Sequence, residues 1–310
     1  MDWKNQTSVT EFWLLGFHNA RSIRIPLFVF FLAVYISILS GNFLIIALVV
    51  VSQSLKSPMY FFLANLSTSD LLLTTIVIPT MLSILLKSKE SISFAGCISQ
   101  FYLFGLSAIT ECFLLTVMSY DRYLAICDPL HYFSIMDSRV QVILVTCSWV
   151  FAFSLTLITV SHMWQLQFCG PNVIDHFFCD ITPLLELSCS DTSVIHLLNL
   201  VMGLPVTMFP IGFIIITYVY ILTTILKIST ISRGKQKAFS TCSSHLAVVC
   251  TYYGTLITLY VIPTKGLSPD VTKVQSLLYT IVTPLFNPVI YSLRNNEIRT
   301  AIQQLMHRRK

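Results

Sequence analysis

Seven long runs of apolar residues, separated by shorter polar segments, dominate the chain. They cover roughly residues 25–51, 58–86, 97–127, 140–161, 194–227, 238–262 and 272–293. A helix needs about 20 residues to cross a hydrocarbon core of about 30 Å, and each run is that long. The runs are continuous rather than alternating, so they predict membrane-spanning helices and not the strands of a membrane barrel.

Composition supports the same fold class. Of the 310 residues, 55% are hydrophobic and 11% are charged, and the mean hydropathy is +0.76. A soluble domain carries about 25% charged residues. We therefore predict an all-α membrane protein, a seven-transmembrane helix bundle that forms one domain over residues 1–310. The first apolar run is too long for a signal-peptide core, so we expect it to be an uncleaved anchor.

Basic residues predict the orientation. With the N-terminus outside, 12 of the 19 lysines and arginines fall on the inner side, where such residues concentrate. We expect a multi-pass protein of the plasma membrane, with residues 1–24 extracellular and residues 294–310 cytoplasmic. Apolar residues recur at helical spacing in this last tail, which predicts a short amphipathic helix on anionic inner-leaflet lipid. A disordered basic tail is the alternative.

The segment 161–191 is the longest loop and is predicted to lie outside. It holds Cys169, Cys179 and Cys189, and a fourth outer cysteine, Cys97, opens the third run. Four cysteines in an oxidising compartment predict two disulfides, but spacing alone leaves the connectivity open. His176 and Cys179 could also be metal ligands, although two residues are too few for a closed site.

Asn5-Gln6-Thr7 is an N-glycosylation signal in the outer tail. Asn65-Leu66-Ser67 matches the same pattern but falls within the second run, so we discount it.

Two acidic residues, Asp70 and Glu111, fall deep inside the runs. Glu111 precedes Arg122 by about 16 Å of helix, and Asp70 follows Pro58 by about 18 Å, so both lie near mid-membrane. A carboxylate there costs several kcal/mol unless it is protonated, paired or solvated. The two acids either share a cation such as sodium or form a protonated, hydrogen-bonded pair.

Prolines inside the runs, at 79, 210, 284 and 288, predict kinks that free backbone carbonyls. Such kinks are either hinges or static features. No P-loop, GxGxxG, GxSxG or HExxH motif is present, and no nucleophile or metal ligands match in depth, so an enzyme is not expected. A transporter or channel would show paired broken spans or a polar lane through the bilayer. The only deep acids here, Asp70 and Glu111, lie at one depth, so this class of protein is disfavoured.

Five blocks in order show that the chain resembles the olfactory receptors, which are rhodopsin-like G-protein-coupled receptors. They are Gly41-Asn42, SPMYFFLANLSTSD at 57–70, MSYDRYLAIC at 118–127, KAFSTCSSHL at 237–246 and PLFNPVIYSLRN at 284–295. The resemblance covers nearly the whole chain. Small departures are Ser119, Leu124, Thr217 before Tyr218, and Lys56, and the sixth span carries TYYGT at 251–255.

The resemblance implies a function: binding of small, mostly apolar volatile odorants, and activation of a stimulatory, olfactory-type G protein that raises cAMP in the perception of smell. It pairs Cys97 with Cys179 and Cys169 with Cys189. Accessory trafficking chaperones are a further implied partner, and no nucleic acid is expected. A charged amine is disfavoured as ligand, because Phe104 stands where amine receptors carry an aspartate.

The resemblance also implies an odorant pocket in the outer half of spans three, five and six under the long loop. Mapped onto this chain, the candidates are Phe104, Gly105, Ala108, Asn199, Met202, Val206, Tyr253, Leu256, Ile257, Tyr260 and Thr280. We expect Gly105 to leave free volume in this pocket. Ordinary helix packing is the alternative for each residue.

The activation switch implied by the family centres on Arg122. Adjacent residues on a helix do not face each other squarely, so Asp121 and Arg122 need not form a tight salt bridge. We expect Asp121, with Ser240 or His245 of the sixth span, to restrain Arg122 at rest. The other switch residues are Tyr123, Tyr218, Asn287, Pro288 and Tyr291.

Overall fold

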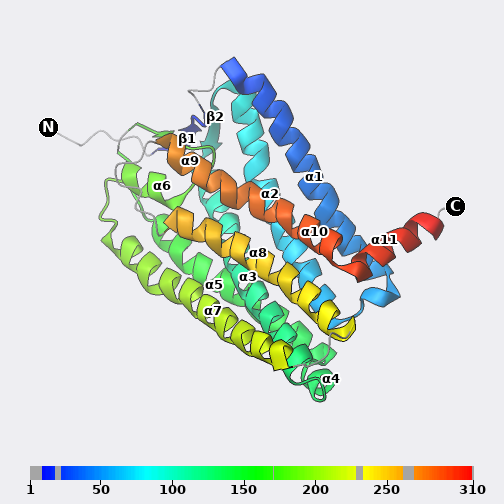
Figure 1. Cartoon of the computed structure of the whole chain (residues 1–310). Coiled ribbons are helices and arrows are strands. Elements are labelled where there is room, and N and C mark those ends of the chain that lie inside the picture. Colours follow the sequence, from blue (N-terminus) through cyan, green and yellow to red (C-terminus); the bar gives the residue numbers. More distant parts are fainter. Residues whose placement is uncertain (1–8, 18–21, 170, 228–232, 261–268, 309–310) are drawn as a thin grey trace.

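The computed structural model describes residues 9–17, 22–169, 171–227, 233–260 and 269–308. Long helices run side by side in a bundle (Figure 1). They are α1 (Arg24–Val51), α2 (Pro58–Lys87), α3 (Phe94–Cys127), α5 (Ser138–Met163), α7 (Ser193–Lys227), α8 (Arg233–Tyr260) and a last segment of α9 (Pro269–Leu277), the π-helical turn η3 (Leu278–Val282) and α10 (Thr283–Arg294). The predicted seven-helix bundle is confirmed, and the observed ends lie within a few residues of the predicted ones.

Five of the helices in the described part are long and apolar enough to cross a membrane: α1, α2, α3, α5 and α7. The last segment also qualifies when it is taken with α11 (Asn296–Arg308), which is bent away from it by 79°. α8 is more polar because it contains KAFSTCSSHL, and it packs against α3 and α10. α11 is the predicted amphipathic helix.

The bundle has polar groups at its centre and an apolar surface. α3 is the central helix and contacts α2, α5, α7 and α8. Asp70 and Glu111 are completely buried, whereas Phe43, Val150 and Phe209 are more than half exposed on α1, α5 and α7. This distribution suits a protein surrounded by lipid, because the apolar surface needs no cover from water.

Two motif residues fix α1 against α10. Pro288 has no N–H, so it leaves the carbonyl of Pro284 without its helical partner. Asn42 donates a hydrogen bond to this carbonyl, at 3.1 Å. Gly41 allows the close approach, because a Cβ at this position would lie 3.0 Å from Pro288. The Gly41-Asn42 pair therefore compensates for the proline of the seventh span.

A small sheet, which the sequence did not predict, accompanies the helical bundle. Its strands are β1 (Glu11–Leu14), β2 (Glu90–Ser93) and β3 (Val173–Ile174), in the order β2-β1-β3. β1 runs antiparallel to β2 and parallel to β3. The strands are too short to leave a pattern in the sequence, but they satisfy the backbone of the N-terminal tail. We call this the sheet end of the bundle; α4 (Tyr132–Ile135) and α11 lie at the opposite, α4 end (Figure 1).

Candidate functional site

Two disulfides hold the long loop at the sheet end. The structure joins Cys97 to Cys179 and Cys169 to Cys189, which is the pairing that the resemblance implies. The first ties the loop to the start of α3, and the second closes a ring within the loop. Cys179 is therefore not available as a metal ligand beside His176. Among the described residues, no group of three or more His, Cys, Asp or Glu side chains is placed to hold a metal ion.

A buried ion pair fixes the loop to α9. The ammonium of Lys273 lies 2.6 Å from Asp175 and 3.6 Å from Asp270, and its side chain is fully buried. Next to it, the Nε2 atom of His176 lies 3.3 Å from the hydroxyl of Ser276. Burial, and then the charge of Lys273, lower the pKa of His176 to about 3. Counting charges along the chain placed Lys273 among the outer bases but could not show that the loop covers it.

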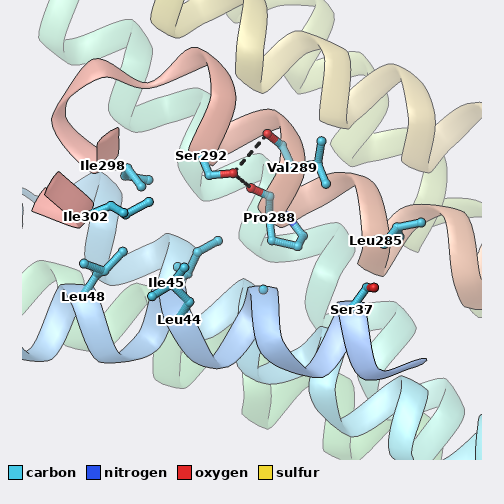
Figure 2. Close-up of a pocket in the computed structure, with 11 residues that line it drawn as sticks. Ser37, Leu44, Ile45, Leu48, Leu285, Pro288, Val289, Ser292, Ile298 and Ile302 are labelled. Carbon is cyan, nitrogen blue, oxygen red and sulfur yellow. Dashed lines mark hydrogen bonds between the residues drawn. The ribbon is translucent and has the colours of Figure 1, made fainter. Parts of the chain in front are cut away.

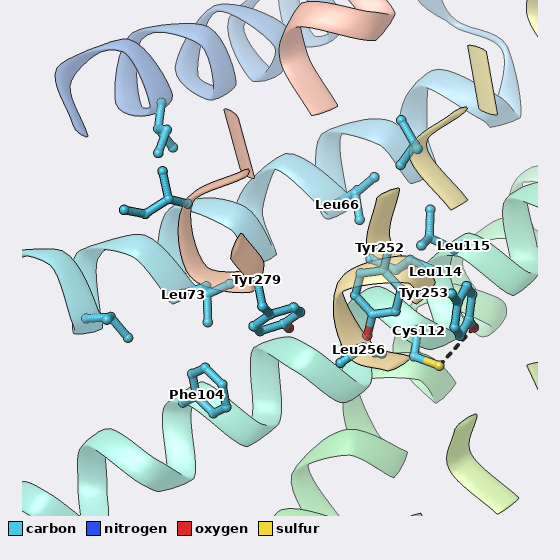
Figure 3. Packing of buried hydrophobic residues seen from close by; sticks show 14 of the residues in the cluster. Leu66, Leu73, Phe104, Cys112, Leu114, Leu115, Tyr252, Tyr253, Leu256 and Tyr279 are labelled. Atoms are coloured by element: carbon cyan, nitrogen blue, oxygen red, sulfur yellow. Dashed lines mark hydrogen bonds between the residues drawn. The ribbon is translucent and has the colours of Figure 1, made fainter. Parts of the chain in front are cut away.

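Aromatic rings from three elements meet below this loop. The ring of Phe104 on α3 lies 5.0 Å from that of Phe178 in the loop and 5.7 Å from that of Tyr279 in η3. Tyr253 and Leu256 of α8 are buried nearby (Figure 3). The structure thus brings together predicted pocket residues from the third and sixth spans.

The thiol of Cys112 connects three helices. Pro210 has no N–H, so the carbonyl of Val206 lacks its helical partner. The Sγ atom of Cys112 lies 3.1 Å from this carbonyl. It also lies 3.1 Å from the hydroxyl of Tyr253 (Figure 3). The contact links α3 to α7 at its proline and to α8.

Sequence reasoning missed Tyr252, Tyr279 and the role of Cys112. Tyr252 is 1% exposed and donates a hydrogen bond to the carbonyl of Ala108, at 2.6 Å. Its ring lies 6.0 Å from Tyr279 and 5.0 Å from Tyr253. The sequence did carry a signal for these tyrosines. A tyrosine inside an apolar run has a buried hydroxyl, which needs a hydrogen-bond partner from another helix.

Two pocket predictions require correction. A Cβ on Gly105 would lie 3.0 Å from the Thr156 side chain of α5, so Gly105 serves close helix packing and leaves no free pocket volume. Ile257 is 45% exposed and is not enclosed by the bundle. Both residues lie on α-helical faces that the sequence pattern could not orient.

The remaining pocket candidates divide by burial. Asn199, Met202 and Val206 of α7 are half-buried, as is Ala108. Thr280 is buried and donates to the carbonyl of Ser276 in its own segment, at 2.9 Å. The side chain of Tyr260 lies outside the described residues.

At the α4 end, Arg122 and Asp121 form a direct ion pair. The Nε atom of Arg122 donates to Oδ2 of Asp121 at 3.0 Å, and Nη2 contacts the same oxygen. The expectation that adjacent residues need not pair tightly is wrong here, because the long arginine side chain folds back over its neighbour. The other carboxylate oxygen of Asp121 accepts a hydrogen bond from Tyr132 of α4, at 2.8 Å.

Tyr132 was not among the predicted switch residues. Its ring is 9% exposed, and burial raises the pKa of its hydroxyl above the usual range, followed by the charge of Asp121. α4 is only one turn long, so no helical periodicity pointed to it.

The sixth-span histidine has a different partner from the one expected. His245 Nδ1 lies 2.6 Å from the hydroxyl of Tyr218, and their rings stack at 5.8 Å. No hydrogen bond joins His245 to Arg122 in the described part of the chain. The Tyr218 hydroxyl also contacts the carbonyl of Cys242, at 3.3 Å. The side chain of Ser240 lies outside the described residues.

Three more of the predicted switch residues have the following surroundings. Tyr123 meets Tyr220 edge to face, with ring centroids 6.0 Å apart. Tyr291 is fully buried, and its hydroxyl has no hydrogen-bond partner among the described residues. Pro288 lies in α10 against Gly41.

The two buried acids face each other across α2 and α3. Asn287 of α10 donates to both carboxylate oxygens of Asp70, at 3.1 and 2.9 Å. Neither oxygen of Glu111 has a hydrogen-bond donor in the described part, and its polar neighbour is the Asp70 carboxyl. The predicted juxtaposition of Asp70 and Glu111 is present.

The fold and site define a multi-pass membrane protein whose buried cluster is linked through one central helix to an arginine at the opposite end. Residues 31–309 match the family model described as olfactory receptor. The chain is similar to human olfactory receptor 10A7 (45% identity, covering 97% of this chain and 95% of that protein) and to human olfactory receptor 11A1 (47%; 97% and 95%). It is also similar to olfactory receptor 1468 of Rattus norvegicus (43%; 99% and 98%). The chain belongs to the olfactory receptor family of G-protein-coupled receptors and is not an enzyme.

Proposed function

We propose that the chain binds a small, mostly apolar volatile odorant within the bundle and activates a stimulatory, olfactory-type G protein that raises cAMP. The contact of Cys112 with Val206 and Tyr253 is the main observation in support. Cys112 lies on the same unbroken helix, α3, as Arg122. The two residues are about 15 Å apart along this helix, so repacking around Cys112 can change the surroundings of Arg122.

The pocket candidates point to a neutral ligand. Phe104, Tyr253 and Leu256 offer apolar surface, while Thr280 and Asn199 offer a hydroxyl and an amide. Small-molecule sites are mostly apolar with a few polar groups that orient the ligand. None of these side chains is charged, so shape and one or two hydrogen bonds would determine which volatile is held.

Activation would follow from contacts that differ between two states. An odorant that repacks the cluster around Tyr253 favours an outward position of α8. This movement separates His245 from Tyr218 and frees Arg122 from Asp121. Tyr218 and Tyr291 then turn toward Arg122, and a cleft opens for the G protein. The odorant shifts the equilibrium only by its differential affinity for the two states.

The sheet end would face outward in the plasma membrane, as the basic residues indicate. The disulfides at this end fit an oxidising compartment. Asn5, the proposed glycosylation site, lies outside the described residues. Trafficking chaperones are proposed as further partners. An antibody to an N-terminal tag should stain intact cells, and staining only after permeabilisation would reverse the orientation.

We further propose that Asp70 and Glu111 hold a sodium ion in the resting state. In the described part of the chain, both buried oxygens of Glu111 and the amide oxygen of Asn287 are without a hydrogen-bond partner. Ser107 of α3 adds a buried hydroxyl. Such an all-oxygen set fits a hard cation, which would neutralise the two carboxyl groups. Sodium, compared with choline, should raise the thermal stability of the purified receptor, and Glu111→Gln should remove the increase. No sodium effect would favour a shared proton.

A cAMP reporter screen of the expressed receptor against a broad odorant panel tests the proposed function. At least one small neutral volatile should raise cAMP in a dose-dependent manner, with no response in cells that lack the receptor. Responses confined to charged amines would contradict the proposed ligand class. Odorant-evoked signalling without cAMP would contradict the proposed G protein.

A further inference from the structure

A groove lies between α1, α10 and α11, with no proposed odorant-pocket residue in its lining. We call it the α1–α11 groove. Its walls include Leu44, Ile45 and Leu48 of α1, Val289 of α10, and Ile298 and Ile302 of α11, and its cavity volume is about 120 Å³. Figure 2 shows these side chains pointing into the same space from the three helices.

Hydrogen bonds hold the walls of the groove in place. Asn42 fastens α1 to α10 through the Pro284 carbonyl. The hydroxyl of Tyr60 on α2 contacts Asn295 at 3.0 Å and Glu297 at 2.8 Å, which fixes the start of α11. Ile298 is consequently 1% exposed. The groove is therefore a built feature and not a gap beside a loose helix.

The groove opens to the acyl-chain region of the membrane. Its rim residues Leu44 and Val289 are each 41% exposed on the outer surface of the bundle. Leu48 lies about 4.5 Å of helix before the end of α1. The two lining hydroxyls, Ser37 and Ser292, donate to carbonyls of their own helices. The lining of the groove is therefore apolar, and the groove lies within one leaflet.

The shape of the groove favours a flexible chain as its occupant. Its cavity volume is small, about 120 Å³, and its walls come from three separate helices. A single acyl chain is one methylene wide and can follow these walls, so we take an acyl chain and not a sterol as the occupant.

A cation lies just beyond the end of α1, next to the turn that contacts α11. Lys56 follows the short turn η2 (Gln53–Leu55), which contacts α11. Its ammonium is exposed and lies 3.3 Å from the carbonyl of Val50, close beyond the lining residue Leu48. Because α1 is a candidate span that ends at Val51, we infer that Lys56 lies at the membrane surface, within reach of a lipid phosphate or carboxylate.

We propose that the α1–α11 groove binds an anionic glycerophospholipid, with one acyl chain between Leu44 and Ile302 and the headgroup at Lys56. Apolar contact holds the chain, and charge selects the headgroup, because one basic residue near an anionic surface contributes about 1 kcal/mol. With the proposed orientation of the chain, this leaflet is the cytoplasmic one. No other part of the inference depends on that orientation.

Photo-crosslinking in nanodiscs tests this proposal on the full-length receptor without odorant or G protein. The probe is phosphatidylserine with a diazirine in the acyl chain, diluted into phosphatidylcholine, and labelled peptides are identified by mass spectrometry. Labels should concentrate on the peptides of Leu44–Leu48 and Ile298–Ile302, compared with the equally lipid-exposed α5. A matched phosphatidylcholine probe should label them about fivefold less, the ratio that corresponds to about 1 kcal/mol.

Two variants separate the chain from the headgroup. Val289→Trp fills the groove from its lipid-facing rim and should abolish the enrichment, whereas Phe43→Trp, on the neighbouring exposed face of α1, should not. Lys56→Ala should remove the preference for phosphatidylserine, whereas Arg139→Ala should preserve it. Uniform labelling of all lipid-facing helices by wild-type receptor would overturn the proposal. Displacement of the label by a sterol, but not by unlabelled phosphatidylserine, would also overturn it. Both probes occupy both leaflets, so a failed orientation or a failed odorant screen would not affect the result.

Discussion

The thiol of Cys112 on α3 and the hydroxyl of Tyr253 on α8 lie 3.1 Å apart, at the level where Pro210 frees a carbonyl of α7. One small side chain thus joins the third, fifth and sixth spans. Any ligand that displaces the ring of Tyr253 must change this contact, so the pair provides a physical route from an odorant to a movement of α8.

Tyr253→Phe should weaken this link while keeping the ring. We expect a loss of about 1 kcal/mol of stability for one buried hydrogen bond. Because the odorant no longer has to break this resting contact, its half-maximal concentration should fall about fivefold. Tyr102→Phe is the matched control, because the buried hydroxyl of Tyr102 has no partner in the described part of the chain. Equal effects of the two substitutions, in thermal unfolding and cAMP dose–response curves, would exclude the Cys112 contact as the cause.

Tyr132→Phe should raise basal cAMP. The substitution removes the hydrogen bond to Asp121 and so weakens the group that restrains Arg122. A lost hydrogen bond to a charged group is worth about 1.5–3 kcal/mol, which is enough to change the resting population several-fold. Phe133→Leu, at an exposed position next to Tyr132, should leave basal cAMP unchanged. Unchanged basal signalling in a Tyr132→Phe receptor at normal surface density would show that α4 does not restrain the arginine.

Gly105→Ala should destabilise the receptor through α5. The new methyl group would lie 3.0 Å from Cγ2 of Thr156, and overpacking of this kind typically costs about 1–3 kcal/mol. Adding Thr156→Ser removes Cγ2 but keeps the hydroxyl that donates to Ala152, so the double variant should recover stability. Gly212→Ala meets nothing within 4 Å and should not destabilise. Failure of Thr156→Ser to restore the melting temperature would contradict the packing explanation.

Acidification should loosen the long loop through His176. The pKa of His176 is lowered to about 3 in the folded receptor, whereas the unfolded chain binds this proton near pH 6.5. The unfolded state therefore carries more protons between these values. The free energy of unfolding should fall as the pH drops from about 6.5 toward 3, by up to about 1.4 kcal/mol per pH unit.

Thermal unfolding at several pH values measures this slope. His176→Gln should reduce this slope by the contribution of about one bound proton. His196→Gln, at an exposed position, should leave the slope unchanged. Parallel slopes in His176→Gln and wild-type receptor would show that other groups carry the acid sensitivity.

Apolar runs predicted the seven-helix bundle because a membrane requires long, continuous helices. Depth counting along the helices also brought Asp70 and Glu111 to the same level, since each residue advances a helix by a fixed rise. The sequence does not show which face of a helix points into the bundle when the helix is apolar all round. Gly105 and Ile257 were misplaced for this reason, and Cys112 was taken for a plain apolar residue.

Contacts between distant segments were equally beyond the sequence pattern. Tyr132 reaches Asp121 from a helix of one turn, and the buried Lys273 pairs with Asp175 of the long loop. The strand β1 forms only by pairing with β2 and β3, which come from two distant segments of the chain. Such features depend on tertiary packing, which leaves no local periodicity.

Odorant-evoked cAMP from an Arg122→Ala receptor tests the central claim most directly. Cells carrying wild-type, Arg122→Ala or Arg139→Ala receptor at equal surface density would be given the same odorant, and odorant binding would be followed by the thermal shift of each purified receptor. We expect Arg122→Ala to keep the odorant-induced thermal shift and lose the cAMP response, while Arg139→Ala, an exposed base on the α4 end, keeps both. Wild-type cAMP amplitude in Arg122→Ala would contradict the account and assign this arginine a purely structural role.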